Sequence, residues 1–288
     1  MWSFLLSKAW SSLGEQIGGA ELVPFDPAAI GHNPSLTWIG HATFLVRMDG
    51  VTFLTDPIFS ERASPVGFAG PKRHQPPGVP LDQLPKIDFV LISHDHYDHA
   101  DSASIEALAR RGARFFVPLE LGEVVRDAGG EAVELDWWQS ARFGNVEITC
   151  VPSQHFSGRS LTDENKRLWA GFAVRGPTRS FYHSGDTGYF DGFAQIRDRL
   201  GPVDLAALPI GAYDPAEIMQ FVHMNPEEAA RAAVDLGAHT AVGMHWGTFD
   251  LTEEPIDEPP ARFQRAAVRN GLPLERAWVM KIGETRDW

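Results

Sequence analysis

Three histidines and an aspartate lie within six positions of one another: His94, His96, Asp98 and His99. They directly follow the apolar run 89–92, which predicts a short strand. Because side chains two positions apart in a strand point to the same side, His94 and His96 are expected to face one ligand together. Imidazole and carboxylate groups are typical of catalytic metal sites, which keep an open coordination position. The segment therefore predicts a catalytic metal centre, in preference to a histidine-rich surface loop.

The cysteine content excludes a structural zinc site of the thiolate type. Such sites are usually closed by four ligands that include several cysteines, and this chain has one cysteine, Cys150. Cys150 lies in the alternating run 146–151, where we expect it to be a small buried apolar residue. A single cysteine also excludes an intramolecular disulfide framework and is compatible with a reducing cytoplasm.

Further imidazole and carboxylate groups follow strand-like runs at His155, Asp186 and His245. Loops that leave strand ends gather along one edge of layered sheets, so we expect these groups to meet the cluster at 94–99. Together they are enough for two ions that share an anionic ligand. We expect His94, His96 and His155 to hold one ion, Asp98, His99 and His245 to hold the other, and Asp186 to bridge them.

A pair of ions held in this way predicts metal-assisted hydrolysis. Two ions about 3.5–4 Å apart bind a water jointly and lower its pKa toward neutrality, so that hydroxide forms without a side-chain base. The second ion polarises the substrate oxygen under attack, and no serine or cysteine nucleophile is needed. The ligand types suit zinc best, although iron, manganese, nickel and cobalt also accept them.

The elements that must position these groups mix strands and helices. Asp49-Gly50 separates two strand-like runs and predicts a hairpin over 35–56. The stretch 57–86 is rich in proline and glycine and predicts a long ordered loop beside the site. A helix is expected from about residue 101 to 111, and helices alternate with strands toward the C-terminus. This order favours two sheets packed face to face with helices outside, in one α/β domain.

Composition limits the partners of the protein. With 288 residues and 43% hydrophobic residues, the chain is long and apolar enough for a sizeable core. Its formal net charge of −13 argues against nucleic acid as a partner. No stretch reads as a transmembrane span or a signal peptide, so a cytoplasmic location is expected, with peripheral membrane contact as the alternative.

Residues 1–30 are expected to form an N-terminal extension that precedes a hydrolase domain over 31–288. Its apolar residues recur at the spacing of an amphipathic helix, from Trp2 to Leu13. Docking of this helix on the body of the chain is favoured. Contact with a membrane surface and contact between two copies in a homodimer are the alternatives.

Nine stretches of the sequence resemble the metallo-β-lactamase-fold hydrolases, and within them the branch of N-acyl-phosphatidylethanolamine-hydrolysing phospholipase D. The His-x-His-x-Asp-His core is typical of the superfamily, and the other stretches, in this order, are far more specific to the branch. The resemblance implies an αββα sandwich, two zinc ions on the seven residues named above and a phosphodiester substrate. The stretches are 38–44, 54–60, 70–73, 93–99, 154–155, 184–189, 208–213, 223–228 and 245–249.

The resemblance also implies roles outside the ligand set. An acid at the position of Asp56 hydrogen-bonds a ligand histidine, and a histidine at the position of His223 lies near the substrate. Asp98 and His223 are therefore the candidate catalytic residues, with His223 as an acid toward the leaving oxygen or a plain helix-entry histidine. His41 either supports the ligands from the pocket wall or is a structural hydrogen bonder. No role is expected for His32, His74, His183 and His239.

Three functions compete on these grounds. The leading one is a phosphodiesterase of phospholipase D type that cleaves N-acyl-phosphatidylethanolamine-like phospholipids by metal-bound hydroxide. A sugar-phosphate lactonase, similar to ascorbate-6-phosphate lactonase, would use the same metals on a carbonyl substrate. A non-catalytic metal-binding scaffold would typically have lost one or more ligands. An open apolar groove would favour the lipid, and a closed basic pocket would favour the small sugar phosphate.

Overall fold

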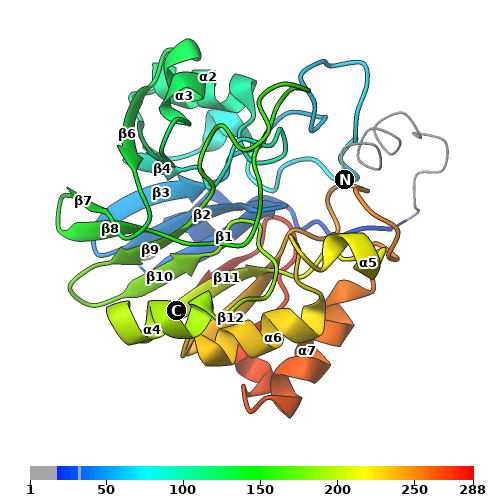
Figure 1. The fold of residues 1–288 in the computed structure, drawn as a ribbon. Helices are drawn as coiled ribbons and strands as arrows, with labels where there is room; N and C mark the ends of the chain where they lie inside the picture. Colours follow the sequence, from blue (N-terminus) through cyan, green and yellow to red (C-terminus); the bar gives the residue numbers. More distant parts are fainter. Residues whose placement is uncertain (1–17, 32–33) are drawn as a thin grey trace.

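Two seven-stranded sheets lie face to face in the computed structural model, which describes residues 18–31 and 34–288 (Figure 1). Helices cover the outer face of each sheet, so that the layers follow the order αββα. The predicted fold class is therefore confirmed. The amphipathic helix expected between Trp2 and Leu13 falls outside the described residues. Among those that are described, no helix is both long and apolar enough to cross a membrane.

The first sheet is antiparallel at one side and parallel at the other. Its strands are β1 (Ser35–Gly40), β2 (Thr43–Met48), β3 (Val51–Thr55), β4 (Phe89–Leu91), β5 (Arg114–Pro118), β6 (Glu131–Leu135) and β14 (Thr285–Asp287). Their order is β14-β1-β2-β3-β4-β5-β6, with parallel pairing from β3 onward. Helices α2 (Ser102–Arg110) and α3 (Gly122–Asp127) pack on its outer face through a separate apolar cluster.

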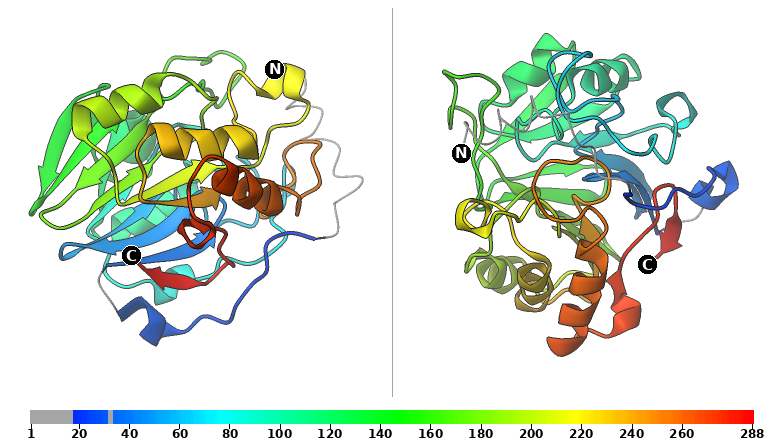
Figure 2. Two further views of the ribbon diagram at one scale, coloured as in Figure 1. Left: turned by 90° about the horizontal axis from the view of Figure 1, so that it is seen from below. Right: turned by 90° about the vertical axis from the view of Figure 1, so that its right-hand side faces the viewer.

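The second sheet is also antiparallel at one side and parallel at the other. Its strands are β7 (Ser140–Phe143), β8 (Val146–Val151), β9 (Gly171–Arg175), β10 (Ser180–His183), β11 (Leu205–Pro209), β12 (Thr240–Met244) and β13 (Ala277–Trp278). They follow the order β13-β12-β11-β10-β9-β8-β7, with parallel pairing from β10 to β13. Helices α4 (Gly192–Leu200), α6 (Pro226–Asp235) and α7 (Pro259–Arg269) cover it, as the left-hand view of Figure 2 shows. The short helix α5 (Ala216–Met219) lies at one end (Figure 1).

The core between the sheets consists of strand residues that are buried on both faces. Every residue of β4 and β11 is buried, which explains why these strands read as continuous apolar runs in the sequence. Phe53 stacks on Phe89 within the first sheet and meets Phe181 of the second sheet edge-on, with ring centroids 5.8 Å apart. Cys150 is buried in this core, as expected.

Local signals in the sequence explain the turns and caps that were expected. Asp49 and Gly50 both have positive φ, at 47° and 82°, as a two-residue hairpin turn requires. Asp101 caps α2 by accepting a hydrogen bond from the backbone of Ser104. Apart from a short 3-10 helix at Leu81–Gln83, the predicted loop 57–86 has no helix or strand of its own.

Candidate metal centre

The seven predicted ligands converge at one edge of the two sheets, because each of them follows the end of a strand. The 94–99 segment leaves β4 of the first sheet. His155, Asp186 and His245 follow β8, β10 and β12 of the second sheet. The inner layers of the sandwich therefore bring groups together that are up to 151 positions apart, the separation between His94 and His245.

Four donor atoms form one compact group at this edge. Nε2 of His99 and Nε2 of His245 each lie 3.4 Å from Oδ2 of Asp98. The same two nitrogens lie 3.1 Å from Oδ2 of Asp186. Donors at about 2.0–2.1 Å from a tetrahedral zinc ion are about 3.3 Å from one another. The observed separations therefore match those of ligands around one ion.

Three histidines form a second group beside the first. Nδ1 of His96 lies 2.9 Å from Nε2 of His94 and 3.3 Å from Nε2 of His155. Oδ2 of Asp186 lies 3.9 Å from the Nε2 atoms of both His94 and His155. One carboxylate oxygen thus lies within reach of both groups, which is where a bridging ligand belongs.

Several donor atoms of the site lack the partners that buried polar atoms normally have. Nε2 of His99, Nε2 of His245 and Oδ1 of Asp186 are buried without a hydrogen bond among the described residues. An unpaired buried polar atom costs about 1–3 kcal/mol, and such atoms are rare unless a ligand satisfies them. The donor set and its unpaired atoms fit a bound metal.

The electrostatics of the two groups differ. Burial lowers the pKa of His96 to about 4 and that of His155 to about 3, so these rings are neutral at pH 7 and their lone pairs are available to a metal. Burial also opposes the charged form of His245, but Asp186 and Asp98 outweigh it and raise the pKa to about 9. A metal held by His245 would have to displace this proton.

Hydrogen bonds outside the donor set orient the ligands. Burial would raise the pKa of Asp56, but the neighbouring His183 and His99 hold it well below its ordinary value. The carboxylate accepts a hydrogen bond from Nδ1 of His99 at 2.8 Å. Val222 O accepts one from Nδ1 of His155 at 2.9 Å, which leaves Nε2 of that ring to the site.

His41 contacts the ligands directly. Its Nε2 lies 2.9 Å from Oδ2 of Asp98, and its ring lies 4.0 Å from the ring of His245. His41, Asp56 and His245 are non-glycine residues with positive φ, at 55°, 36° and 61°. Backbone strain of this kind persists where the surrounding structure holds it, commonly at functional sites.

His183 is the site residue for which the sequence suggested no role. It is fully buried at the end of β10, and its Nε2 lies 2.7 Å from Oδ2 of Asp56. In the sequence it is the last residue of an aromatic strand, 127 positions away from its partner. A histidine in such a run reads as a core residue, so only the pairing of the two sheets shows its contact.

A cavity of about 320 Å³ opens above the two donor groups. His96, Asp98, Asp186, His223 and His245 form its polar side. The remaining lining is mostly apolar and comes mainly from the loop 57–86, the 156–159 segment, α5 and residues 251–252, with Tyr97 and Ala212 in addition. The apolar lining includes Ala63, Pro65, Pro71, Phe156, Ala212, Met219 and Leu251.

Cations near this cavity are engaged by the protein itself. The Arg159 side chain donates to the backbone carbonyls of Asp95 and Ala100, and its guanidinium lies 4.0 Å from the ring centroid of Tyr97. Lys72 pairs with Glu61 at 2.9 Å. The cavity is therefore not a basic pocket.

His223 lies on the cavity wall. Its Nε2 is 3.9 Å from Oδ2 of Asp186, and its ring centroid is 5.1 Å from that of His155. Burial lowers its pKa to about 3, so the ring is neutral at pH 7. Its Nδ1 has no hydrogen-bond partner among the described residues.

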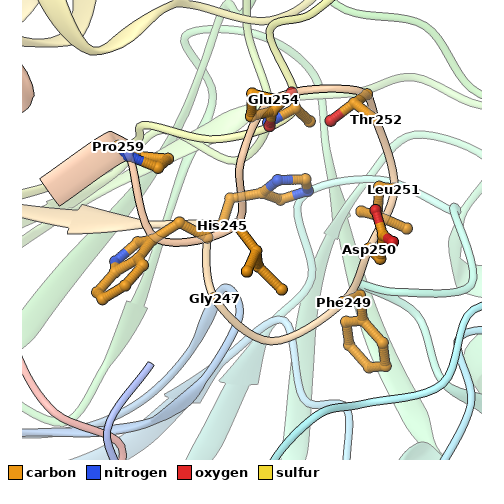
Figure 3. A pocket seen from close by; sticks show the side chains of 11 residues that line it. His245, Gly247, Phe249, Asp250, Leu251, Thr252, Glu254 and Pro259 are labelled. Carbon is orange, nitrogen blue, oxygen red and sulfur yellow. The ribbon is translucent and has the colours of Figure 1, made fainter. Parts of the chain in front are cut away.

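A second cavity behind His245 is too small for a substrate. It has a volume of about 20 Å³ and is enclosed by the 245–259 segment, which Figure 3 shows looping around it. About 10–15 Å³ is enough for one water molecule. Leu251 and Thr252 line both cavities, so this segment forms the wall between them.

Two solved structures with the same architecture are named as hydrolases. Igni18, a metallo hydrolase from the archaeon Ignicoccus hospitalis, is 26% identical to this chain and superposes with a TM-score of 0.67 over 88% of this chain and 97% of its own. An isothiocyanate hydrolase from Delia radicum gut bacteria superposes with a TM-score of 0.70 over 88% of this chain and 99% of its own. Its sequence identity is 21%, so this similarity shows the fold alone. The fold and the donor set define a metal-dependent hydrolase of the metallo-β-lactamase type.

Sequence relatives place the chain within this class. The model of the beta-lactamase superfamily domain matches residues 52–246, and the chain belongs to that superfamily. N-acyl-phosphatidylethanolamine-hydrolyzing phospholipase D 1 of Caenorhabditis elegans is 44% identical over 77% of this chain and 67% of its own. A metal-dependent hydrolase of Methanopyrus kandleri is 32% identical over 88% of this chain and 99% of its own. The recognition of the phospholipase D-like branch is thereby confirmed.

Proposed function

We propose that the chain is a dinuclear zinc phosphodiesterase of phospholipase D type that acts on N-acyl-phosphatidylethanolamine-like phospholipids. The observation that carries this proposal is the largely apolar cavity directly above the His and Asp donors. Such a cavity suits the alkyl part of a lipid whose phosphodiester lies on the polar side. The names of the relatives in Caenorhabditis elegans and, at 34% identity, Saccharomyces cerevisiae support the same substrate class.

The composition of the cavity favours the lipid over a sugar phosphate. A small phosphorylated sugar would need cations that are free to pair with its phosphate. Arg159 is committed to backbone carbonyls, and Arg167 is committed to Asp95 at 3.0 Å. Neither cation is available for this purpose, so we place the lactonase second.

The position of Asp186 supports the proposal of two ions. Its Oδ2 lies near both donor groups, and the two groups together contain more nitrogen and oxygen donors than one tetrahedral ion accepts. We assign zinc because imidazole and carboxylate ligands suit it. When bound, the two ions would lower the pKa of a water and stabilise charge on the phosphoryl oxygens.

The remaining polar groups of the cavity would handle the substrate. His223 is neutral and faces the cavity, so it can donate a hydrogen bond to a substrate oxygen. His41 donates a hydrogen bond to Oδ2 of Asp98. This hydrogen bond fixes the plane of the carboxylate and therefore also the direction of its other oxygen. Phe156 and Met219 would exclude water around the reacting phosphodiester.

Three exposed apolar side chains, here called the apolar rim, are close in sequence to residues that line the cavity. Phe68, Leu161 and Phe221 are 86%, 80% and 61% exposed. Each of them lies within a few positions in the sequence of a residue that lines the cavity. The right-hand view of Figure 2 shows these loops and α5 around the same face. We propose that this rim is where the protein meets lipid, in addition to any contact by residues 1–17.

The proposal is tested by product analysis with three substrates offered side by side. Zinc-loaded protein is incubated with N-acyl-phosphatidylethanolamine in vesicles, with a soluble aryl phosphodiester and with a phosphorylated sugar lactone. We expect an N-acylethanolamine and phosphatidate from the first and the alcohol from the second. His96→Ala is the matched negative control, since it removes one donor. Cleavage of the lactone alone would overturn the assignment.

A further inference from the structure

A single buried carboxylate lies between the two sheets and beneath both donor groups. Asp56 follows β3 of the first sheet and is fully buried. Its Oδ1 accepts a hydrogen bond from the backbone of Ser93 at 2.7 Å. Its Oδ2 accepts from three side chains, which belong to Ser93, His99 and His183. Because all of these groups are buried, each hydrogen bond fixes its partner without competition from water.

The carboxylate reaches one ligand of each group. It contacts His99 directly, through Nδ1 at 2.8 Å. It contacts His94 through Ser93, whose Oγ donates to Asp56 at 2.7 Å and lies 2.9 Å from Nδ1 of His94. Since the hydroxyl proton points to Asp56, Oγ accepts the Nδ1 proton of His94. Both rings are then held as the tautomer that leaves Nε2 free for a metal.

His183 completes this arrangement from the opposite sheet. Its Nε2 donates to Oδ2 of Asp56 at 2.7 Å, across the sandwich from β10. Asp186 follows His183 by three positions, on the loop that leaves the same strand. The hydrogen bond therefore also fixes the position of the end of β10 relative to the ligands of the first sheet. Asp186, on the loop that follows, is positioned with it.

We propose that His183 is a positioning residue that fixes the Asp56 carboxylate and, through it, the rings of His94 and His99, so that both ion groups are set from one point. This inference rests on the metal sites of the proposed function. It differs from the role implied for Asp56 because it adds the relay through Ser93 and the anchor from the second sheet. An ordinary core histidine would contribute to stability and leave metal affinity unchanged.

The variants separate these possibilities by their chemistry. His183→Phe fills the space and cannot donate, whereas His183→Gln offers an amide that can donate from nearly the same point. Ser93→Ala removes the link to His94 and keeps the backbone hydrogen bond to Asp56. Tyr182→Phe is the matched control: it lies in the same strand, is fully buried, and loses a hydroxyl that has no hydrogen-bond partner among the described residues.

The measurement is zinc binding by the full-length protein, with no substrate present. Protein stripped by a chelator is titrated with zinc against a chromophoric competitor, elemental analysis counts the ions, and circular dichroism confirms folding. We expect His183→Phe to weaken every bound ion by about 10- to 100-fold, the usual effect of changes just outside the ligands. His183→Gln should recover most of this loss. Ser93→Ala should weaken one ion, and Tyr182→Phe should match the wild type.

Other results would overturn the inference. Wild-type zinc affinity in folded His183→Phe would show that the contact has no role in the metal site. Equal losses in His183→Gln and His183→Phe would show that space, and not hydrogen bonding, matters. If His183→Phe does not fold, near-wild-type zinc affinity in His183→Gln together with a loss of affinity in Ser93→Ala would support the inference. No loss in Ser93→Ala would remove the relay to His94. If the wild-type protein binds only one ion, the proposal of two ions is wrong. The inference about His183 can still be tested, because the variants report on the affinity for that one ion.

Discussion

Oδ2 of Asp186 lies 3.1 Å from Nε2 of His245, although the two residues leave different strands of the second sheet and are 59 positions apart. The same oxygen lies 3.1 Å from Nε2 of His99, which comes from the first sheet. Asp186 is therefore the donor at which the two sheets and the two donor groups meet, and its replacement should affect the site more than any other.

Asp186→Asn should remove zinc more completely than any change outside the donor set. The amide keeps the shape of the side chain but loses the negative charge that two cations would share. We expect zinc affinity to fall by more than about 100-fold, the upper end for residues that only support ligands. Elemental analysis after dialysis measures the effect. Asp198→Asn, on the exposed face of α4, is the control, and two tightly held ions in Asp186→Asn would contradict the bridging role.

His223→Ala should separate turnover from metal binding. The side chain lines the cavity and is not one of the seven predicted ligands, so both ions should remain. We expect the rate of phosphodiester cleavage to fall about 100-fold or more, as for other groups that assist proton transfer or hydrogen-bond the reacting oxygen. His239→Ala, on the loop before β12, serves as control. An unchanged rate with full metal content would remove His223 from the mechanism.

The exposed apolar rim should matter only when the substrate is in a membrane. Replacement of Phe68, Leu161 and Phe221 by serine removes the side chains expected to enter the lipid surface. We expect the ratio of the rate on vesicles to the rate on a soluble aryl diester to fall about tenfold. Val268→Ser and Leu274→Ser remove exposed apolar side chains elsewhere and should not change this ratio. An unchanged ratio in the rim variant would contradict the proposed contact.

Cys150 should be unreactive in the folded protein up to alkaline pH. Burial raises the pKa of its thiol, with a smaller contribution from Asp136, and only the thiolate is nucleophilic. The unfolded chain releases this proton near pH 8.5, so stability from the thiol is present below that pH and falls above it. Iodoacetamide at pH 9 should label Cys150 in denaturant only. Rapid labelling of the native protein would contradict its burial.

The sequence was sufficient for the fold, and it pointed to residues that the structure brings together at one edge, because both leave local signals. Asp49-Gly50 specifies its hairpin, and polar residues that interrupt apolar runs, such as His94 and His245, mark strand ends. The aromatic residues of the cavity wall leave no such signal. Phe156 lines it, whereas Trp137 and Trp169 pack against each other, with ring centroids 6.3 Å apart. Which aromatic residue faces a cavity depends on packing between distant segments.

The contact of His183 with Asp56 shows the same limit most clearly. Neither residue has a neighbour in the sequence that indicates the other, and their strands pair with different sheets. The role of Asp56 followed from resemblance, and that of His183 required the distance across the sandwich. Long-range hydrogen bonds of this kind are specified by the arrangement of layers and not by local periodicity.

The central claim is that the chain holds two ions on one histidine and aspartate cluster beneath an apolar cavity. Anomalous diffraction from zinc-loaded crystals, recorded on both sides of the zinc absorption edge, tests it most directly. We predict two peaks about 3.5–4 Å apart, one among His94, His96 and His155 and the other among Asp98, His99 and His245, with Asp186 between them. A single peak, or peaks elsewhere in the molecule, would contradict the account.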